Sequence, residues 1–252
     1  MTASRENNAM PHFPSGDGRP PWRALVLTLF PEAFPGPLGV SLAAQARDAG
    51  IWSLDTIQIR DFGLGKHRQV DDTPAGGGAG MVLRADVLGP ALDHAATLSP
   101  NAPMIYLSPR GTPLTQSLAR SLAEGPGVTL LAGRFEGIDE RVIAAKGLKE
   151  VSIGDYVLAG GEVAAMVLIE ACVRLLPGVL GASESLASES FETGLLEYPQ
   201  FTKPRDWQGH AIPDILLSGD HKKVEAWRQD QSEKLTAARR PDLLHPKGQK
   251  RP

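Results

Sequence analysis

Three glycine-bearing loops, each directly after an apolar segment, are the clearest candidates for chemistry in this sequence. They cover residues 108–111, 133–137 and 154–161. Glycine allows the main chain to approach a ligand closely and to adopt positive φ. Because ligands of parallel sheets bind outside the carboxyl ends of the strands, the three loops are expected to converge. They predict one cofactor pocket that is made largely of backbone.

The sequence lacks the residue patterns of several common kinds of catalytic site. No GxGxxG follows the first apolar segment, and the glycine run at 76–80 lacks the Lys-Ser/Thr pair of a phosphate loop. No histidine pair has metal-ligand spacing, and no GxSxG nucleophile elbow is present. The single cysteine, Cys172, excludes an intramolecular disulfide and a cysteine-rich zinc site. A transfer reaction between two bound substrates, dominated by positioning and electrostatics, fits better.

Apolar segments alternate with helical patterns, which predicts an α/β fold with a mainly parallel sheet and helices on both faces. The expected strands are residues 24–30, 51–60, 104–107, 128–131 and 151–153. The expected helices are residues 40–49, 86–96, 113–124, 140–147 and 162–176. Thr112 and Asp139 are expected to cap two of these helices, with Pro113 at the first position of one.

Composition divides the chain into four parts. Residues 1–21 are polar and without periodicity, so they are expected to be a disordered extension. Residues 22–180 form the predicted α/β cofactor-binding domain. Residues 181–203 begin with a serine-rich stretch that predicts a flexible linker or a mobile lid. Residues 204–252 are expected to be a small helical domain, with Val224, Trp227 and Leu235 as apolar contacts.

Charge is distributed unevenly over an otherwise ordinary composition. The 252 residues are 42% apolar and 22% charged, with a formal net charge of −3. From Lys203 onward the chain has 11 basic and 7 acidic residues, which is compatible with contact to phosphates. On charge alone, a solvated helical face explains that excess better. No apolar stretch reaches the ~18 residues of a membrane span, and no secretory signal is visible, so a cytoplasmic protein is expected.

Long motifs follow one another along the chain, within a stretch from about Ala24 to Leu244. They are LFPEAF (29–34), VDDTPAGGGAGM (70–81), YLSPRG (106–111), GRFEGIDERV (133–142), SIGDYVLAGGE (152–162), PGVLG (177–181), SFETGLLEYPQFTKP (190–204) and LLSGDH (216–221). These motifs resemble those of the bacterial tRNA (guanine-37-N1)-methyltransferase family, which belongs to the knotted, SPOUT-type methyltransferases. The similarity implies methyl transfer from S-adenosylmethionine to N1 of guanosine 37 in the anticodon stem-loop of tRNA.

The resemblance also implies an architecture that periodicity does not reveal. Members of the family have a deep C-terminal trefoil knot, which simple topology rules treat as a rare exception. They are homodimers, and they hold the donor in the knot. They are associated with magnesium, although no metal ligands can be assigned in this sequence. Residues 204–252 would then be a tRNA-binding domain.

By resemblance, the three glycine-bearing loops hold the donor. Glu136 would lie near the sulfonium, where a carboxylate offsets positive charge; the alternative is an exposed loop acid. Phe135 stands where the common pattern has Tyr. The cofactor-binding residues carried over to this chain are Tyr106, Leu107, Ser108, Pro109, Gly133, Glu136, Gly137, Ile153, Gly154, Tyr156, Leu158, Gly160 and Gly161.

Methylation of guanine N1 requires a base to remove the ring proton and a cation to stabilise the charge that spreads toward O6. The family supplies an Asp and an Arg. The matching arginine is Arg174, whose alternative role is a surface ion pair with Glu170. At the base position this chain has Glu189 instead of Asp. Glutamate has similar basicity, but a lone glutamate in a serine-rich loop is also a common solvated acid.

A long loop, residues 61–80, resembles the substrate loop of the family and is unusually long for a structureless segment. His67, Arg68, Asp71 and Asp72 are its candidate substrate-binding residues. Candidates for contacts with the tRNA backbone are Lys203, Arg205, Lys222, Lys223 and Arg228.

Two other functions remain open from the sequence. A related enzyme could methylate ribosomal RNA or a ribose hydroxyl, which needs no carboxylate at 189. A non-catalytic RNA-binding protein with the same fold is the other, and the change from Asp to Glu at 189 is compatible with it.

Overall fold

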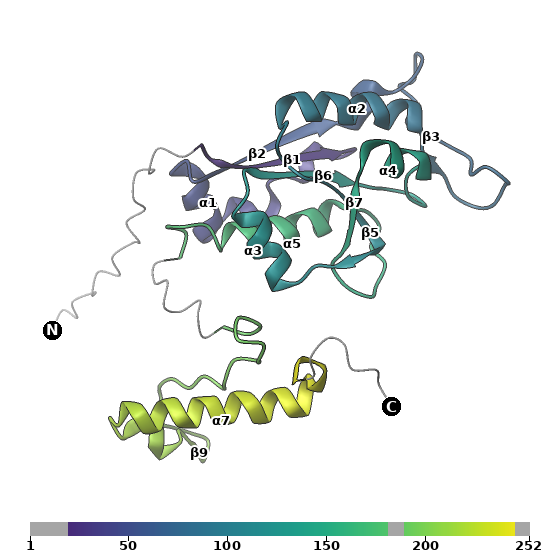
Figure 1. Ribbon diagram of the computed structural model, residues 1–252. Coiled ribbons are helices and arrows are strands. Elements are labelled where there is room, and N and C mark those ends of the chain that lie inside the picture. Colours follow the sequence, from purple (N-terminus) through teal and green to yellow (C-terminus); the bar gives the residue numbers. More distant parts are fainter. Residues whose placement is uncertain (1–19, 181–188, 245–252) are drawn as a thin grey trace. The chain divides into compact units, whose positions relative to one another are not determined.

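The computed structural model describes residues 20–180 and 189–244, which fall into two compact units that divide after Gly181 (Figure 1). Nearly all of the predicted N-terminal extension, residues 181–188 of the predicted lid and the last eight residues lie outside the described residues. The described remainder of the predicted linker, residues 189–203, belongs to the second unit.

A five-stranded sheet with only parallel pairs forms the centre of the first unit, in the order β2-β1-β6-β5-β7. Its strands are β1 (Trp22–Thr28), β2 (Trp52–Gln58), β5 (Met104–Pro113), β6 (Gly127–Ala132) and β7 (Lys149–Ser152). A short antiparallel pair, β3 (Asp71–Asp72) and β4 (Val82–Leu83), lies apart from it. The predicted α/β class with a mainly parallel sheet is confirmed.

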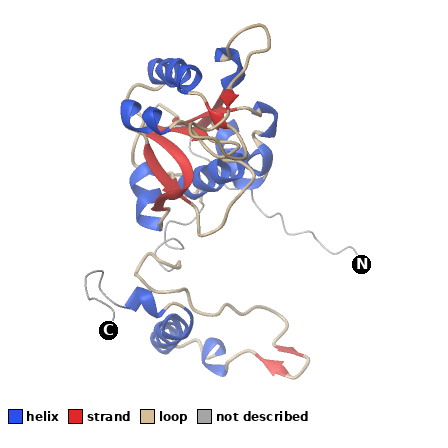
Figure 2. Ribbon diagram, turned by 90° about the vertical axis from the view of Figure 1, so that its right-hand side faces the viewer, coloured by secondary structure: helices blue, strands red, loops and turns tan. Residues whose placement is uncertain are grey.

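Helices cover both faces of the sheet (Figures 1 and 2). On β1, Trp22, Ala24 and Val26 enter one apolar core, and Leu25 and Leu27 enter the other. This alternation buries both faces of the strand, as a parallel sheet requires. The first core is closed by α1 (Ser41–Asp48), α3 (Gln116–Ala123) and α5 (Glu162–Val173). The second core is closed by α2 (Ala85–Leu98) and α4 (Glu140–Lys146).

The boundary between β5 and α3 differs from the prediction. Thr112 and Pro113 do not begin the helix, because β5 continues through them after a register shift and pairs again with Val151 and Ser152 of β7. Thr115 is the N-cap instead, with its hydroxyl accepting a 3.2 Å hydrogen bond from Leu118 N. A threonine–proline pair suits either a helix start or an extended edge, and pairing with β7 decides between them.

Other local predictions are confirmed. Asp139 caps α4 and accepts a 3.0 Å hydrogen bond from Arg141 N, and Gly147 ends that helix with φ +60°. The loop at 61–80 is more ordered than expected, because it contains β3 and a bridge between Leu64 and Gln69. The 3₁₀ helices in the described part of the chain are Pro31–Ala33, Gly36–Gly39, Ile59–Phe62, Asp214–Leu217 and Pro241–Leu244.

The second unit is built around one long helix, α7 (His221–Arg239), together with the short strands β8 (Asp206–Trp207) and β9 (His210–Ala211). The segment before β8 packs along α7: Leu196 N donates a 2.9 Å hydrogen bond to Thr236 Oγ1. The rings of Phe201 and Trp227 lie 6.2 Å apart. Among the described residues, no helix combines the length and the apolar character needed to cross a membrane.

Candidate functional site

A pocket of about 370 Å³ lies at the carboxyl ends of β5, β6 and β7. The part of β5 around its register shift and the loops that follow β6 and β7 form most of its wall, and Glu140 of α4 and Ala164 of α5 complete it. The wall contains every residue predicted to bind the cofactor: Tyr106, Leu107, Ser108, Pro109, Gly133, Glu136, Gly137, Ile153, Gly154, Tyr156, Leu158, Gly160 and Gly161. The three glycine-bearing segments therefore converge as the sequence predicts, although residues 108–111 lie within β5 and not in a loop after it. Their role in binding stays a prediction.

Glycines let the loops of this wall approach one another without side chains. A Cβ at Gly133 would lie 2.8 Å from Cε2 of Tyr106, and one at Gly161 would lie 2.7 Å from Cα of Ala132. Gly161 N also donates a 2.8 Å hydrogen bond to the carbonyl oxygen of Gly133. The wall is thus main chain packed on main chain, which leaves peptide groups available to a ligand.

Gly161→Ala is expected to weaken S-adenosylmethionine binding about 10- to 100-fold, because overpacking costs ~1–3 kcal/mol and the wall must move. Isothermal titration calorimetry measures the dissociation constant. Gly89→Ala is the matched control, since a Cβ within α2 would meet only Lys146 Cε, at 4.0 Å. An unchanged dissociation constant in the folded Gly161→Ala protein would contradict this expectation.

Several residues of the wall were missed by sequence reasoning. Most are immediate neighbours of predicted residues, so loop continuity could have found them, whereas Glu140 and Ala164 belong to the helices that follow. The missed residues are Ile138, Glu140, Val151, Ser152 and Ala164. The wall also contains residues of the predicted loops that were not singled out: Arg110, Arg134, Phe135, Val157 and Ala159.

Arg110, in the same wall, pairs with two glutamates. Its Nη2 lies 2.9 Å from Oε2 of Glu140 and 3.2 Å from Oε1 of Glu150. The hydrogen bond to Glu140 and the charge of Glu150 raise the pKa of the Arg110 guanidinium. Burial raises the pKa of the neighbouring Tyr106 hydroxyl, so both groups keep their protons at neutral pH.

The only cysteine in the chain, Cys172, is buried on α5, and burial raises the pKa of its thiol to about 12.

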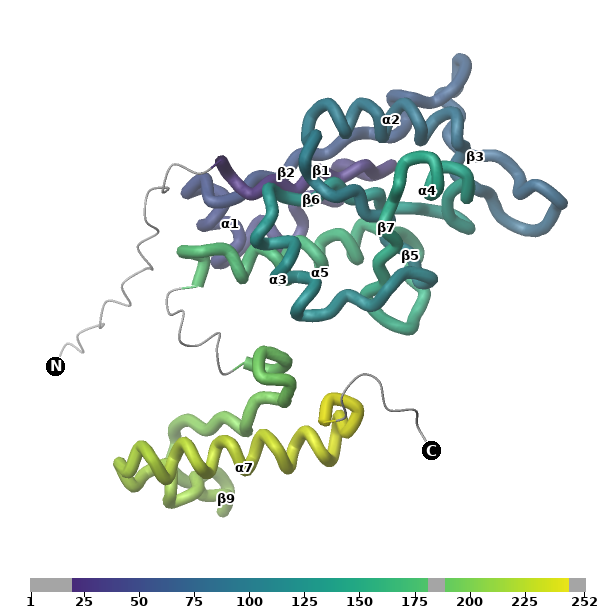
Figure 3. The backbone as a smooth tube through the Cα atoms, viewed as in Figure 1, coloured from purple at the N-terminus to yellow at the C-terminus, as the bar shows by residue number. Residues whose placement is uncertain are grey.

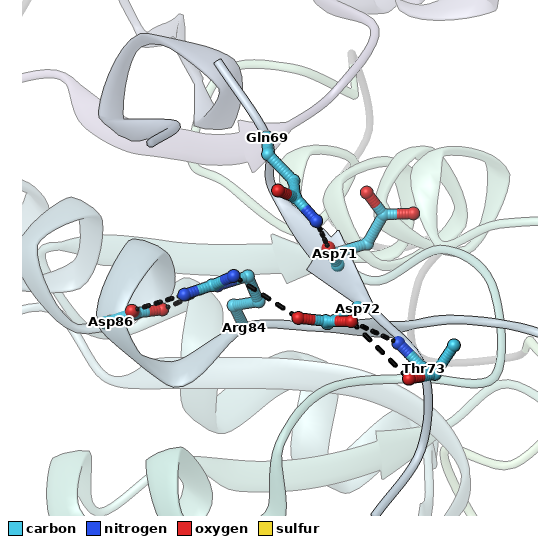
Figure 4. Close-up of polar contacts among 6 residues, drawn as sticks. All are labelled: Gln69, Asp71, Asp72, Thr73, Arg84 and Asp86. Carbon is cyan, nitrogen blue, oxygen red and sulfur yellow. Dashed lines mark hydrogen bonds and ion pairs between the residues drawn. The ribbon is translucent and has the colours of Figure 1, made fainter. Parts of the chain in front are cut away.

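The predicted substrate loop lies beside the pocket, but its four candidate side chains are not in the pocket wall. Arg68 Nη1 pairs with Asp61 Oδ1 at 2.9 Å. Asp72 accepts a 2.8 Å hydrogen bond from Thr73 N and a 3.3 Å bond from Arg84, which also binds Asp86 (Figure 4). Asp71 starts β3, and His67 is exposed.

Main-chain hydrogen bonds join the segment directly after this loop, residues 81–83, to the pocket. Glu136 N donates to the Met81 carbonyl at 2.9 Å, and Leu83 N donates to the Gly137 carbonyl at 3.0 Å. Asp139 N donates to the Leu83 carbonyl at 3.0 Å. Figure 3 shows the chain near β3 beside the segment that leads into α4. A substrate held by the loop would therefore be adjacent to the pocket edge around Glu136.

The two predicted catalytic residues lie in different units. Arg174 is half-buried at the C-terminal end of α5 and is not in the pocket wall. Glu189 is half-buried in the second unit, at the start of a segment in which Ser190 Oγ accepts a 2.9 Å hydrogen bond from Glu197 N. Neither unit by itself therefore contains both side chains.

The candidates for tRNA contact all belong to the second unit. Lys203 and Lys222 are exposed, and Lys223 pairs with Asp220 at 3.0 Å. Arg205 lies 3.6 Å from Asp214, and the Arg228 guanidinium lies 4.8 Å from the centre of the Tyr198 ring. In residues 20–180 and 189–244, no group of three or more His, Cys, Asp and Glu side chains is placed to hold a metal ion.

Comparison with known proteins gives one consistent match. The model of the family described as "tRNA (Guanine-1)-methyltransferase TrmD" matches residues 22–246. The chain is 64% identical to a tRNA (guanine-N(1)-)-methyltransferase of Nitrobacter winogradskyi, over 88% of this chain and 92% of that protein. It is 60% identical to the protein of that name from Mesorhizobium japonicum, over 89% of this chain and 98% of that protein. A relative with the same name in Rhizorhabdus wittichii is 61% identical, over 87% of this chain and 89% of that protein.

Proposed function

The chain belongs to the tRNA (guanine-1)-methyltransferase TrmD family, and from this premise we infer that it transfers a methyl group from S-adenosylmethionine to N1 of guanosine 37 in tRNA. The observation that carries the inference is the family match over residues 22–246, which includes all three loops of the pocket wall. The enzyme is thus a tRNA methyltransferase, and tRNA is its macromolecular substrate. Its proposed place of action is the cytoplasm.

The pocket wall has the chemistry that the methyl donor requires. Main-chain groups of the glycine-bearing loops can hydrogen-bond to the adenine and to the amino-acid part of the donor, and the apolar side chains can cover its rings. Glu136 is exposed at the wall, where its carboxylate would offset the positive charge of a sulfonium. When bound there, the donor supplies an electrophilic methyl group.

We assign the proton transfer and the charge stabilisation to residues outside the pocket wall. Glu189 accepts the N1 proton of guanine. The ring nitrogen could then take the methyl group, and the carbon–sulfur bond of the donor would break to leave S-adenosylhomocysteine. Arg174 stabilises the negative charge that spreads toward O6. The loop with Arg68, Asp71 and Asp72 orients the guanosine beside Glu136. The target base has to leave the stack of the anticodon loop to reach this position.

We propose that the enzyme is a homodimer with the trefoil knot of its family, and one face of α5 supports the dimer. Val163 and Val167 lie one helical turn apart and are 57% and 42% exposed, although the opposite face of α5 is deeply buried. Val157, in the loop before the helix, is 84% exposed. A helix that is apolar on all sides is normally covered on all sides, so a second copy is its proposed cover.

The double variant Val163→Glu/Val167→Glu is expected to be monomeric at micromolar concentration, because it places four carboxylates in the proposed interface of a symmetric dimer. Light scattering coupled to size exclusion gives the mass. Val40→Glu, at another exposed valine, is the control and should remain dimeric. A wild-type monomer, or a dimer that survives both glutamates, would remove α5 from the interface.

The decisive experiment for the function combines unmodified tRNA transcripts with labelled S-adenosylmethionine and analyses the nucleosides. The expected product is N1-methylguanosine at position 37. A 2′-O-methylated nucleoside, or label only in ribosomal RNA, would overturn the proposed substrate and atom. A parallel reaction with a chelator tests the association with magnesium that the family suggests.

A further inference from the structure

Glu162 is a buried carboxylate behind the pocket wall that the proposed mechanism does not use. It is 6% exposed and is the first residue of α5, directly after Gly161. It is not in the pocket wall, although Gly160, Gly161 and Ala164 on either side of it are. A buried charge is costly unless it is paired and hydrogen-bonded, so its surroundings indicate what it does.

Side chains from the ends of two strands hydrogen-bond to or pair with the Glu162 carboxylate. Thr28, which ends β1 and is fully buried, donates a 2.8 Å hydrogen bond from Oγ1 to Glu162 Oε1. The same Oγ1 accepts a 2.9 Å hydrogen bond from Phe30 N. Arg134, two residues after β6, places Nη1 3.5 Å from Glu162 Oε2. Its guanidinium carbon lies 4.7 Å from the centre of the Phe30 ring, so Phe30 contacts both Arg134 and Thr28.

We call Thr28, Arg134 and Glu162 the Glu162 clamp. It connects the carboxyl ends of β1 and β6 to the start of α5. Glu162 is 134 residues from Thr28 and 28 residues from Arg134 in the sequence, so the clamp is a tertiary feature rather than a local turn. The position of Glu162 in the first turn of α5 is also favourable, because a carboxylate there interacts with the positive end of the helix dipole.

The clamp lies directly against the main chain of the pocket wall. A Cβ on Gly160 would collide with the side chain of Arg134 and would lie 2.5 Å from Glu162 Oε2. Gly160 forms an antiparallel bridge with Arg134, and Gly161 N bonds to the Gly133 carbonyl. Movement of either charged group would therefore move the Gly160–Gly161 peptide, which faces the pocket.

We propose that Glu162 is a positioning residue for the methyl donor: through Thr28 and Arg134 it fixes the main chain of Gly160 and Gly161, and so sets donor affinity without touching the donor. The inference rests on the proposed function only in taking this pocket as the donor site. It assigns a role to a group whose burial the reaction itself does not explain. A hydrophobic residue of similar size would fill the space at lower desolvation cost, which makes a purely packing role a poor account of a buried charge.

Glu162→Gln tests the inference with little change in shape. Its amide oxygen can still accept from Thr28, but the charge that attracts Arg134 is lost. We expect the dissociation constants of S-adenosylmethionine and S-adenosylhomocysteine to rise about tenfold, the equivalent of ~1.4 kcal/mol, with kcat at saturating donor within about twofold of wild type. Glu124→Gln, an exposed glutamate at the end of α3, is the matched control and should bind both ligands normally.

Two further variants separate positioning from stability. Arg134→Gln should weaken donor binding to a similar degree. The double variant Glu162→Gln/Arg134→Gln should bind the donor no more weakly than the single variant with the lower affinity, because both changes break the same ion pair. Thr28→Val removes the hydroxyl with little change in volume and serves as the second probe if Glu162→Gln does not fold. Each protein is titrated well below its melting temperature.

The outcomes are distinguishable. A lowered melting temperature with unchanged ligand affinities in Glu162→Gln and Thr28→Val would make the clamp structural and overturn this inference alone. Equal loss in the Glu124→Gln control would also overturn it. A wild-type protein that binds neither ligand would instead overturn the proposed function.

Discussion

Glu189→Gln is expected to reduce methyl transfer to tRNA about 10²- to 10⁴-fold, the usual contribution of a general base. Glutamine keeps the size of the side chain but cannot accept the N1 proton of guanine. The change lies in the second unit, outside the pocket, so the affinity for S-adenosylmethionine should stay at the wild-type value. Single-turnover kinetics with saturating tRNA measure the chemical step, and calorimetry measures donor binding.

Glu189→Asp provides the decisive comparison, because it restores the residue of the common family pattern and shortens the carboxylate by one methylene. We expect it to keep most of the activity. Glu225→Gln, an exposed carboxylate on α7 in the same unit, controls for loss of charge near a polyanionic substrate. Full turnover in Glu189→Gln would exclude Glu189 as the base and would favour the related enzyme activity, methylation of an acceptor that needs no deprotonated ring nitrogen.

Arg174→Ala should lower kcat about 10²- to 10³-fold, the range found when one stabilising donor is removed from a developing anion. The guanidinium is assigned to the negative charge on guanine O6, which is greatest in the transition state. Donor affinity should change little, since Arg174 lies at the end of α5 away from the pocket wall. Arg174→Lys should recover part of the rate, because a cation remains but the planar fork is lost.

Arg47→Ala is the matched control, since Arg47 is a half-buried arginine on α1 whose partner Asp48 is 3.8 Å away. It should leave the rate unchanged. If Arg174 instead serves only to stabilise the end of α5, Arg174→Ala will melt at a lower temperature and show normal specific activity below that temperature. That result would remove Arg174 from the mechanism.

Much of the fold follows from short-range patterns. The apolar run at 24–30 predicts a strand buried on both faces, and Leu25 and Val26 do enter opposite cores. Asp139 and Gly147 mark the two ends of α4, because capping and left-handed conformation are properties of single residues. The pocket could be predicted for a related reason: parallel strands place their carboxyl ends at one edge, so loops after successive strands have to meet.

Contacts between segments distant in the sequence decided the features that local patterns do not predict. Local preference allows a helix to start at Thr112, but pairing with Val151 keeps that residue in β5. Arg110 meets Glu140 and Glu150 only because β5, β7 and α4 are neighbours. Thr28 and Glu162 are 134 positions apart, and their hydrogen bond exists because β1 ends beside the start of α5. Periodicity records which face of an element is buried, whereas the identity of the partner depends on the order of strands in the sheet, which is set by the packing of the whole domain.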